Sequence, residues 1–203
     1  MKWGESHKAN FTRQGTEGML RRIMHEDALN ILLARTKEWP LFPPEERGLF
    51  HTLASLIISQ RIPFSRSQAM RARIYKATGA SSLDVLKTVS KEEAWALGVK
   101  GPKWTRIEAL REAFKDGDPP LNEIRKIPGV GPWTEGSTRI MFGDYSLGFV
   151  HGDKAVQAEA GRILGRFVCE KELKAIVGRG EIEAMGRLFS RLWYRTGPGK
   201  DKK

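Results

Sequence analysis

The stretch of sequence that decides the fold is Leu121-Asn122-Glu123-Ile124-Arg125-Lys126-Ile127-Pro128-Gly129-Val130-Gly131-Pro132-Trp133-Thr134. Leu121, Ile124 and Ile127 recur at steps of three, which is typical of one apolar face of a helix. The chain then turns at Pro-Gly-Val-Gly, and Pro132 stands where a new helix accepts proline as its first residue. The stretch predicts a helix, a tight turn and a second helix over about residues 121–143.

The two glycines of this turn suit contact with a phosphate group. Glycine adopts positive φ easily and carries no side chain, so Gly129 and Gly131 leave the backbone N–H groups at the start of the second helix open to an anion. Such a contact holds DNA without reading its sequence. An ordinary helix–helix turn would also use Gly-Val-Gly, so the turn by itself leaves both interpretations open.

The composition points to a folded, basic protein. The 203 residues include 35 Lys and Arg against 24 Asp and Glu, a net charge of +11, and 40% are hydrophobic. This balance excludes a membrane protein and a disordered polyelectrolyte, and it favours a polyanion such as nucleic acid as partner. The single cysteine, Cys169, excludes an internal disulfide and a cysteine-ligated iron–sulfur cluster. The polar N-terminal segment does not look like an export signal, so we expect a cytoplasmic protein.

Apolar residues recur mostly at helical spacing, as in the run Leu49, Phe50, Leu53, Leu56 and Ile57. The alternation typical of strands is nearly absent, so we expect an all-α protein of about ten helical segments separated by Gly- and Pro-rich breaks. We expect two helical lobes. The central lobe comprises residues 46–144 and carries the hairpin, and the terminal lobe is built from residues 1–45 and 145–203.

The segment from Ile127 to Thr134 resembles the helix-hairpin-helix DNA glycosylases, in particular the branch of the 3-methyladenine DNA glycosylases II (AlkA-like). The resemblance covers about residues 46–196. It implies the two-lobed glycosylase fold without an iron–sulfur cluster, and a monovalent cation, Na⁺ or K⁺, at the backbone of Ile127 and Val130. No other cofactor is expected. The residues expected to contact the DNA backbone are Gly129, Val130, Gly131 and Thr134, together with Lys126 and with Lys103, which lies beside Gly101-Pro102 in a stretch that resembles the family's Gly-x-x-x-Lys segment.

A candidate catalytic residue follows the hairpin. Asp153 precedes Lys154-Ala155-Val156, and an aspartate at this place is also a favoured N-cap, so the residues alone favour a structural role. In the glycosylases that the chain resembles, a catalytic aspartate follows the hairpin at a similar distance, and Asp153 lies 20 residues after Trp133. The resemblance therefore implies that the Asp153 carboxylate stabilises the positive charge on the sugar as the N-glycosidic bond breaks.

The attacked base must leave the duplex, and aromatic faces commonly hold the extruded base. The resemblance places Trp133, Ser137 and Trp193 in the base pocket, although ordinary packing is the alternative for both tryptophans. Ser59-Gln60-Arg61-Ile62-Pro63 resembles the loop that enters the base stack in this family. Arg61 is thus the expected wedge and Gln60 the expected probe of base edges, with a polar helix cap and a surface arginine as the alternative.

The resemblance implies a monomeric, monofunctional DNA glycosylase of base excision repair, located at the nucleoid if the source is prokaryotic. It would flip a damaged purine, an alkylated one such as 3-methyladenine being favoured, out of duplex DNA and hydrolyse its N-glycosidic bond. Bifunctional relatives carry a Schiff-base lysine where this chain has Trp133, so we expect no lyase activity beyond a weak one through Lys154. Ser137 and Glu135 depart from the family pattern, which leaves hypoxanthine, uracil and 8-oxoguanine as alternative substrates. A hairpin protein that binds DNA without catalysis is the alternative from another class.

Overall fold

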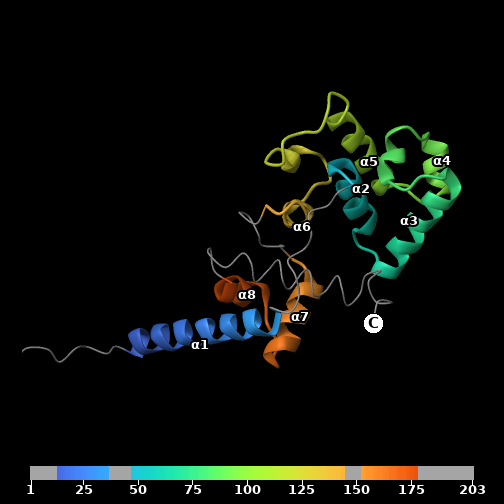
Figure 1. The fold of residues 1–203 in the computed structure, drawn as a ribbon. Helices are drawn as coiled ribbons and strands as arrows, with labels where there is room; N and C mark the ends of the chain where they lie inside the picture. The colour runs from blue at the N-terminus through green and yellow to red at the C-terminus, as the bar shows by residue number, and fades with distance from the viewer. Residues whose placement is uncertain (1–12, 37–46, 145–151, 178–203) are drawn as a thin grey trace, which may run out of the picture.

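The chain folds as a set of packed helices (Figure 1). The computed structural model describes residues 13–36, 47–144 and 152–177, and these form eight α-helices and two 3₁₀-helices without a strand. The prediction of an all-α fold is therefore confirmed for these residues. The elements are, in chain order, α1 (Arg13–Thr36), α2 (Leu49–Ser59), α3 (Phe64–Thr78), η1 (Leu83–Lys87), α4 (Lys91–Ala96), α5 (Pro102–Ala113), η2 (Ile124–Lys126), α6 (Pro132–Met141), α7 (Lys154–Leu164) and α8 (Glu170–Val177).

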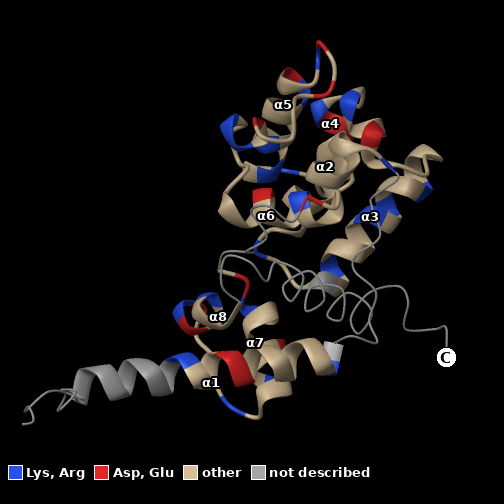
Figure 2. Cartoon of the chain, turned by 60° about the vertical axis from the view of Figure 1, so that its left-hand side comes forward, with Lys and Arg blue, Asp and Glu red and all other residues tan. Residues whose placement is uncertain are grey.

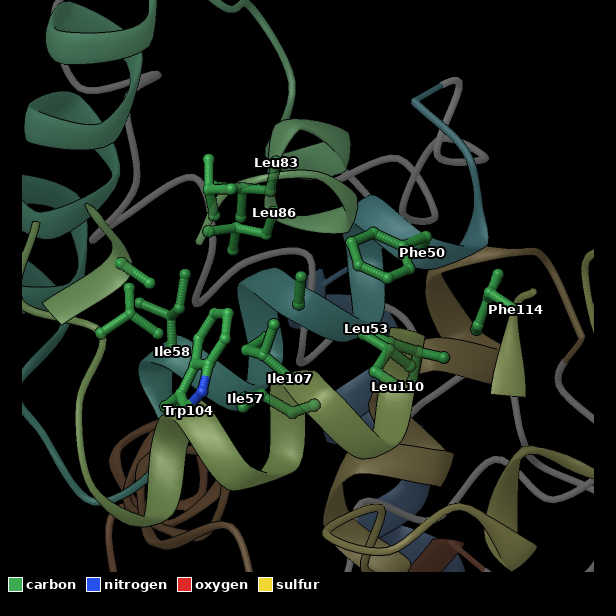
Figure 3. Packing of buried hydrophobic residues seen from close by; sticks show 14 of the residues in the cluster. Phe50, Leu53, Ile57, Ile58, Leu83, Leu86, Trp104, Ile107, Leu110 and Phe114 are labelled. Carbon is green, nitrogen blue, oxygen red and sulfur yellow. The ribbon is translucent and has the colours of Figure 1, made fainter. Parts of the chain in front are cut away.

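A first hydrophobic cluster lies between α2, η1 and α5 (Figure 3). Helix α2 buries nine of its eleven residues, so several of its faces are covered at once, and its residues Phe50, Leu53, Ile57 and Ile58 are at most 1% exposed. Facing them are Leu83 and Leu86 of η1 and Trp104, Ile107 and Leu110 of α5. The cluster extends to Ile124, Ile127 and Val130. The turn between η2 and α6 is thereby anchored in the same core as α2 and α5.

A second hydrophobic cluster forms where α1, α7 and α8 pack together, apart from α3, α4 and α5 (Figure 1). Helix α6 enters this cluster through Ile140 and Met141, and α2 enters it through Leu56. The buried residues of α6 therefore do not belong to a central lobe alone, because its last turn packs with the terminal helices. The lobe boundary at residue 144 stays a prediction. None of the described helices has the length and apolar run that crossing a membrane requires.

The first arm of the hairpin is shorter than the sequence predicts. Residues 121–123 form turns, and η2 spans only Ile124–Lys126. The predicted helix is present only as this short 3₁₀ segment, because the apolar steps of three between Leu121, Ile124 and Ile127 match the 3.0-residue turn of a 3₁₀-helix as well as a face of an α-helix. The second arm is α6, which begins at Pro132 as predicted.

Candidate functional site

The turn between η2 and α6 is closed by a backbone hydrogen bond from the Val130 N–H to the Ile127 carbonyl at 3.0 Å. Pro128 and Gly129 occupy its central positions, and Gly129 has φ of 93°, the pattern of a type II turn. A larger residue would also not fit at position 129, because a Cβ added to Gly129 would lie 2.4 Å from Cγ of Arg106. Gly129 is exposed on one side, and on the other side its backbone packs directly on the Arg106 side chain of α5.

No side chain caps the N-terminus of α6, which begins at Gly131 as N-cap with Pro132 as the first helical residue. Proline has no N–H to satisfy, but the N–H groups of Trp133 and Thr134 have no partner within the helix. Gly131 is half-buried and Gly129 is exposed. This geometry is the one expected for a phosphate contact at a helix N-terminus, and the contact itself stays a prediction.

Asp153 lies at the start of α7 and holds two helices at once. Its Oδ1 accepts hydrogen bonds from the backbone N–H groups of Ala155 at 2.8 Å and Val156 at 3.0 Å, which is the N-cap arrangement. Its Oδ2 accepts a hydrogen bond from Nε1 of Trp133 at 2.8 Å. A carboxylate offers about four lone-pair positions, so one position on Oδ2 is left for a further donor.

The bond from Trp133 joins the first turn of α6 to the candidate catalytic carboxylate. Trp133 is half-buried, and its ring packs against the second hydrophobic cluster. Because the indole N–H is committed to Asp153, the orientation of the ring is fixed with respect to the carboxylate. Sequence reasoning placed Trp133 beside the site but did not foresee this bond.

Ser137 is one helical turn after Trp133 and is fully buried. Its hydroxyl has no hydrogen-bond partner in the part of the chain that the structure describes. It therefore lies within the packed interior and not on an open wall. Trp193, the remaining predicted pocket residue, lies outside the described residues, so the base pocket stays a prediction. Two surface hollows of about 510 and 310 Å³ lie elsewhere, the first along α5 and the second between α1 and α8.

Arg61, the predicted wedge, has an unusual backbone. Its φ is 58°, and within the described residues it is the only non-glycine residue with positive φ. Left-handed backbone is strained for a residue with a Cβ, and such strain is concentrated at functional positions. The Arg61 side chain is exposed at the end of α2. The structure thus presents this arginine on a turn that must be held in place by its neighbours.

Gln60, predicted as a probe of base edges, provides part of that hold. Its Nε2 donates to the Gly129 carbonyl at 3.1 Å and to Oγ1 of Thr134 at 3.0 Å, and its Oε1 accepts from Nη1 of Arg106. The amide therefore ties the Arg61 turn to both sides of the hairpin. A contact between Gln60 and a base would compete with these bonds and stays a prediction.

Lys103 supports the same turn from α5. Its Nζ donates to the carbonyls of Ile58 at 2.6 Å and Gln60 at 2.8 Å. These carbonyls lie at the C-terminal end of α2, where the helix itself provides no N–H partner. Burial, and then the neighbouring charge of Arg106, lower the pKa of the Lys103 ammonium below its usual value. A phosphate contact by Lys103 would have to replace these bonds. The side chain of Lys126 is 74% exposed, although it lies 3.2 Å from a Glu123 carboxylate, so it can reach a phosphate.

Two predicted backbone-binding residues are buried, since Val130 is 3% exposed and Thr134 is 1% exposed. These fractions cover the whole residue, backbone included, so a DNA contact at Val130 or Thr134 would require the surrounding chain to move, and both contacts stay predictions. Sequence reasoning missed two supports of the hairpin. Arg106 lies one turn after Lys103, so helical spacing could have placed the two on one face of α5. Arg125 donates from Nη1 to the Val130 carbonyl at 2.7 Å, and no spacing rule indicates that bond.

The monovalent cation implied at Ile127 and Val130 does not fit the residues present. The Ile127 carbonyl accepts from the Val130 N–H, and the Val130 carbonyl accepts from the positively charged Arg125. Within residues 13–36, 47–144 and 152–177 there is also no cluster of three or more His, Cys, Asp or Glu side chains that could bind a metal.

No protein-family model matches the chain, and no curated protein or solved structure matches it.

Proposed function

We propose that this chain is a DNA glycosylase of the helix-hairpin-helix type, with the two-lobed fold of that superfamily, which removes a damaged base from duplex DNA. The observation that carries the proposal is the 2.8 Å hydrogen bond from Trp133 to Asp153. It joins the helix that follows the hairpin to a carboxylate with one acceptor position to spare. A phosphate at the start of α6 would then bring a neighbouring nucleotide near that carboxylate.

The proposed reaction is hydrolysis of the bond between C1′ of the sugar and the base nitrogen. The base leaves with the bonding electron pair, and water supplies the hydroxyl group that forms on C1′. The remaining proton of that water goes to solvent when the departing base was a cationic alkylated purine, and to the base when it was neutral. Positive charge builds on the sugar in between, and the Asp153 carboxylate stabilises it. Trp133 acts as a positioning residue because it fixes the Oδ2 atom that remains available. No lysine stands at the Trp133 position, so we expect the proposed enzyme to leave the abasic site uncut apart from a weak lyase activity through Lys154.

The proposed extrusion of the base depends on the Arg61 turn. Arginine is planar, so it can stack where the base has left and can donate to the orphaned base. Gln60 fixes this turn relative to the hairpin. An alkylated purine is the favoured substrate because an electron-poor ring would stack well on the Trp133 indole. Deaminated and oxidised bases are the alternative substrates, because Glu135 and Ser137 make this neighbourhood more polar than the family pattern.

A hairpin module that binds DNA without catalysis is the second candidate. The observation in its favour is that Asp153 makes both bonds of an ordinary N-cap, to Ala155 and Val156. A carboxylate placed solely to start α7 would make the same two bonds.

The deciding experiment offers the protein duplexes that carry 3-methyladenine, 1,N6-ethenoadenine, hypoxanthine, uracil or 8-oxoguanine, followed by alkaline cleavage of abasic sites. We expect strand breaks with a methylated purine, none with Asp153→Asn, and duplex binding by both proteins. Asp118→Asn is the matched control, because it removes an equal charge at an exposed position after α5. Duplex binding without excision of any of the bases would favour the binding module, and absence of duplex binding would refute both functions.

A further inference from the structure

The Val130 carbonyl is one of the two backbone groups at which the resemblance implies a metal cation. In this chain the nearest positive charge to that carbonyl is a side chain, because Nη1 of Arg125 donates to it at 2.7 Å. An alkali cation on the same oxygen would lie beside the guanidinium and would be repelled by it. The other carbonyl, that of Ile127, accepts the backbone bond that closes the turn and keeps a second lone pair, so the misfit rests on the charge of Arg125 at the Val130 carbonyl.

Other contacts hold the Arg125 guanidinium in this place. Its Nε lies 3.7 Å from Oε2 of Glu135, and Glu135 is only 16% exposed and also pairs with Arg139. A Cβ added to Gly131 would lie 3.9 Å from Nη1 of Arg125. The guanidinium therefore lies directly beside the N-cap of α6, where the unpaired backbone N–H groups begin.

The Arg125 side chain is also 46% exposed. A guanidinium has five N–H donors in a planar fork, and the Val130 carbonyl accepts from only one of them. Nε faces Glu135, and the other donors on the two terminal nitrogens are available to a phosphate oxygen that approaches the start of α6. A guanidinium suits this contact better than an ammonium group, because it can donate to the carbonyl and to the phosphate in one plane.

We propose that the Arg125 guanidinium is a fixed cation of the hairpin, which takes the place of an alkali metal ion at the Val130 carbonyl and bridges that carbonyl to a DNA phosphate. This inference rests on the proposed function, because it requires the hairpin to bind DNA. It deepens that function by assigning the phosphate contact to one side chain. It also makes DNA binding independent of which alkali cation is in solution.

The test measures the affinity of the whole chain for a fluorescent duplex in KCl, NaCl and tetramethylammonium chloride at equal ionic strength. We expect the three dissociation constants to agree within twofold. A larger advantage for K⁺ or Na⁺ over tetramethylammonium, an ion too large and too poorly coordinating for a carbonyl site, would overturn the inference. This comparison uses the unaltered protein, so it does not depend on whether a variant folds.

The second measurement is the slope of log K against log salt for Arg125→Met. Loss of one phosphate contact reduces the slope by about 0.9, whereas Arg125→Lys keeps the charge and should keep the slope. Lys115→Met is the matched control, because it removes one charge at an exposed position after the end of α5, and its slope should equal that of the unaltered protein. An unchanged slope for a folded Arg125→Met variant would overturn the inference alone. Absence of duplex binding in every salt would refute the proposed function together with it.

Discussion

The hydrogen bond between Trp133 and Asp153 can be measured through the stability of the protein, independently of any activity. The informative change is Asp153→Asn. Asparagine is as good an N-cap as aspartate, so its carbonyl oxygen will stay on the N–H groups of Ala155 and Val156. Its amide NH₂ then faces the Trp133 indole, and two donors meet where a donor and an acceptor met before.

The expected cost follows from the bonds that change. A hydrogen bond to a charged acceptor contributes about 1.5–3 kcal/mol, and a negative charge at a helix N-terminus contributes about 0.3–1 kcal/mol. Asp153 is half-buried, so solvent reduces both terms. We expect Asp153→Asn to lower the free energy of unfolding by about 2 kcal/mol.

The Trp133→Phe background removes the donor and keeps an aromatic ring. In that background the asparagine NH₂ meets no opposing N–H, so the cost of Asp153→Asn should fall to about 1 kcal/mol. The assay is urea unfolding at pH 7, followed by far-ultraviolet circular dichroism because the substitutions alter tryptophan fluorescence. All four proteins of the cycle are compared at constant m-value.

Trp104→Phe provides the control cycle. Trp104 is 3% exposed and its Nε1 has no hydrogen-bond partner in the described residues, so its effect should add to that of Asp153→Asn within about 0.5 kcal/mol. Additivity of the same quality for Trp133→Phe and Asp153→Asn would refute the bond between these two side chains, and with it the positioning role of Trp133.

Three further predictions concern the turns and the acid stability. Gly129→Ala should lower the free energy of unfolding in urea by about 3 kcal/mol, because alanine is strained in the left-handed backbone and its Cβ overlaps Arg106. The control is Gly143→Ala, where φ is 72° and no atom lies within 4 Å of the added Cβ, so only the backbone strain of about 1 kcal/mol should be lost. Equal losses of stability in the two variants would contradict the packing of Gly129 against Arg106. The free energy of unfolding of Arg61→Gly should be about 1 kcal/mol higher than that of Arg61→Ala, because glycine adopts φ of 58° without strain. Equal stability of the two variants would show that the turn is unstrained. Both variants should lose base excision and keep their affinity for DNA. Burial raises the pKa of Asp84, but hydrogen bonds from Ser82 and Lys87 outweigh it and hold the pKa below its usual value, so its stabilising effect is present above the unfolded pKa and is lost as pH falls through the lower folded value. The stability gap between the unaltered protein and Asp84→Asn should shrink from pH 5 to pH 3, and a constant gap would contradict the assignment.

Local sequence patterns determine much of the fold. Pro128, Gly129 and Pro132 predict the turn and the start of α6 because each restricts or frees φ at one position, and that effect does not depend on distant residues. The start of α7 is equally local, since Asp153 is a favoured N-cap wherever it precedes a helix. The steps of three in the first arm predicted a helix but not its type or its length, because that period does not distinguish an α-helical face from a 3₁₀-helix.

The contacts of the candidate site are not local, which is why the sequence did not reveal them. Gln60 and Gly129 are 69 residues apart, and Lys103 reaches carbonyls more than 40 residues away. Such pairs form only after α2, α5 and the hairpin have packed on one core. The residue types restrict them little, because glutamine and lysine suit many surface positions. The bond from Trp133 to Asp153 was closest to being predictable, since the resemblance already placed both residues at the site.

The same packing changes the meaning of the basic composition. Figure 2 shows Lys and Arg spread over α3, α4 and α5 and not gathered on one helix, with acidic residues beside them on α4 and α5 but none on α3. Two cations serve the interior, since Lys103 of α5 binds carbonyls of α2 and the 7% exposed Arg139 of α6 pairs with Glu135 and Asp144. A net charge of +11 therefore overstates the charge available to a phosphate backbone. The salt dependence of binding counts the phosphates that are contacted and not the total charge. Arg125 and Lys126 should consequently account for more of that slope than their share of the basic residues.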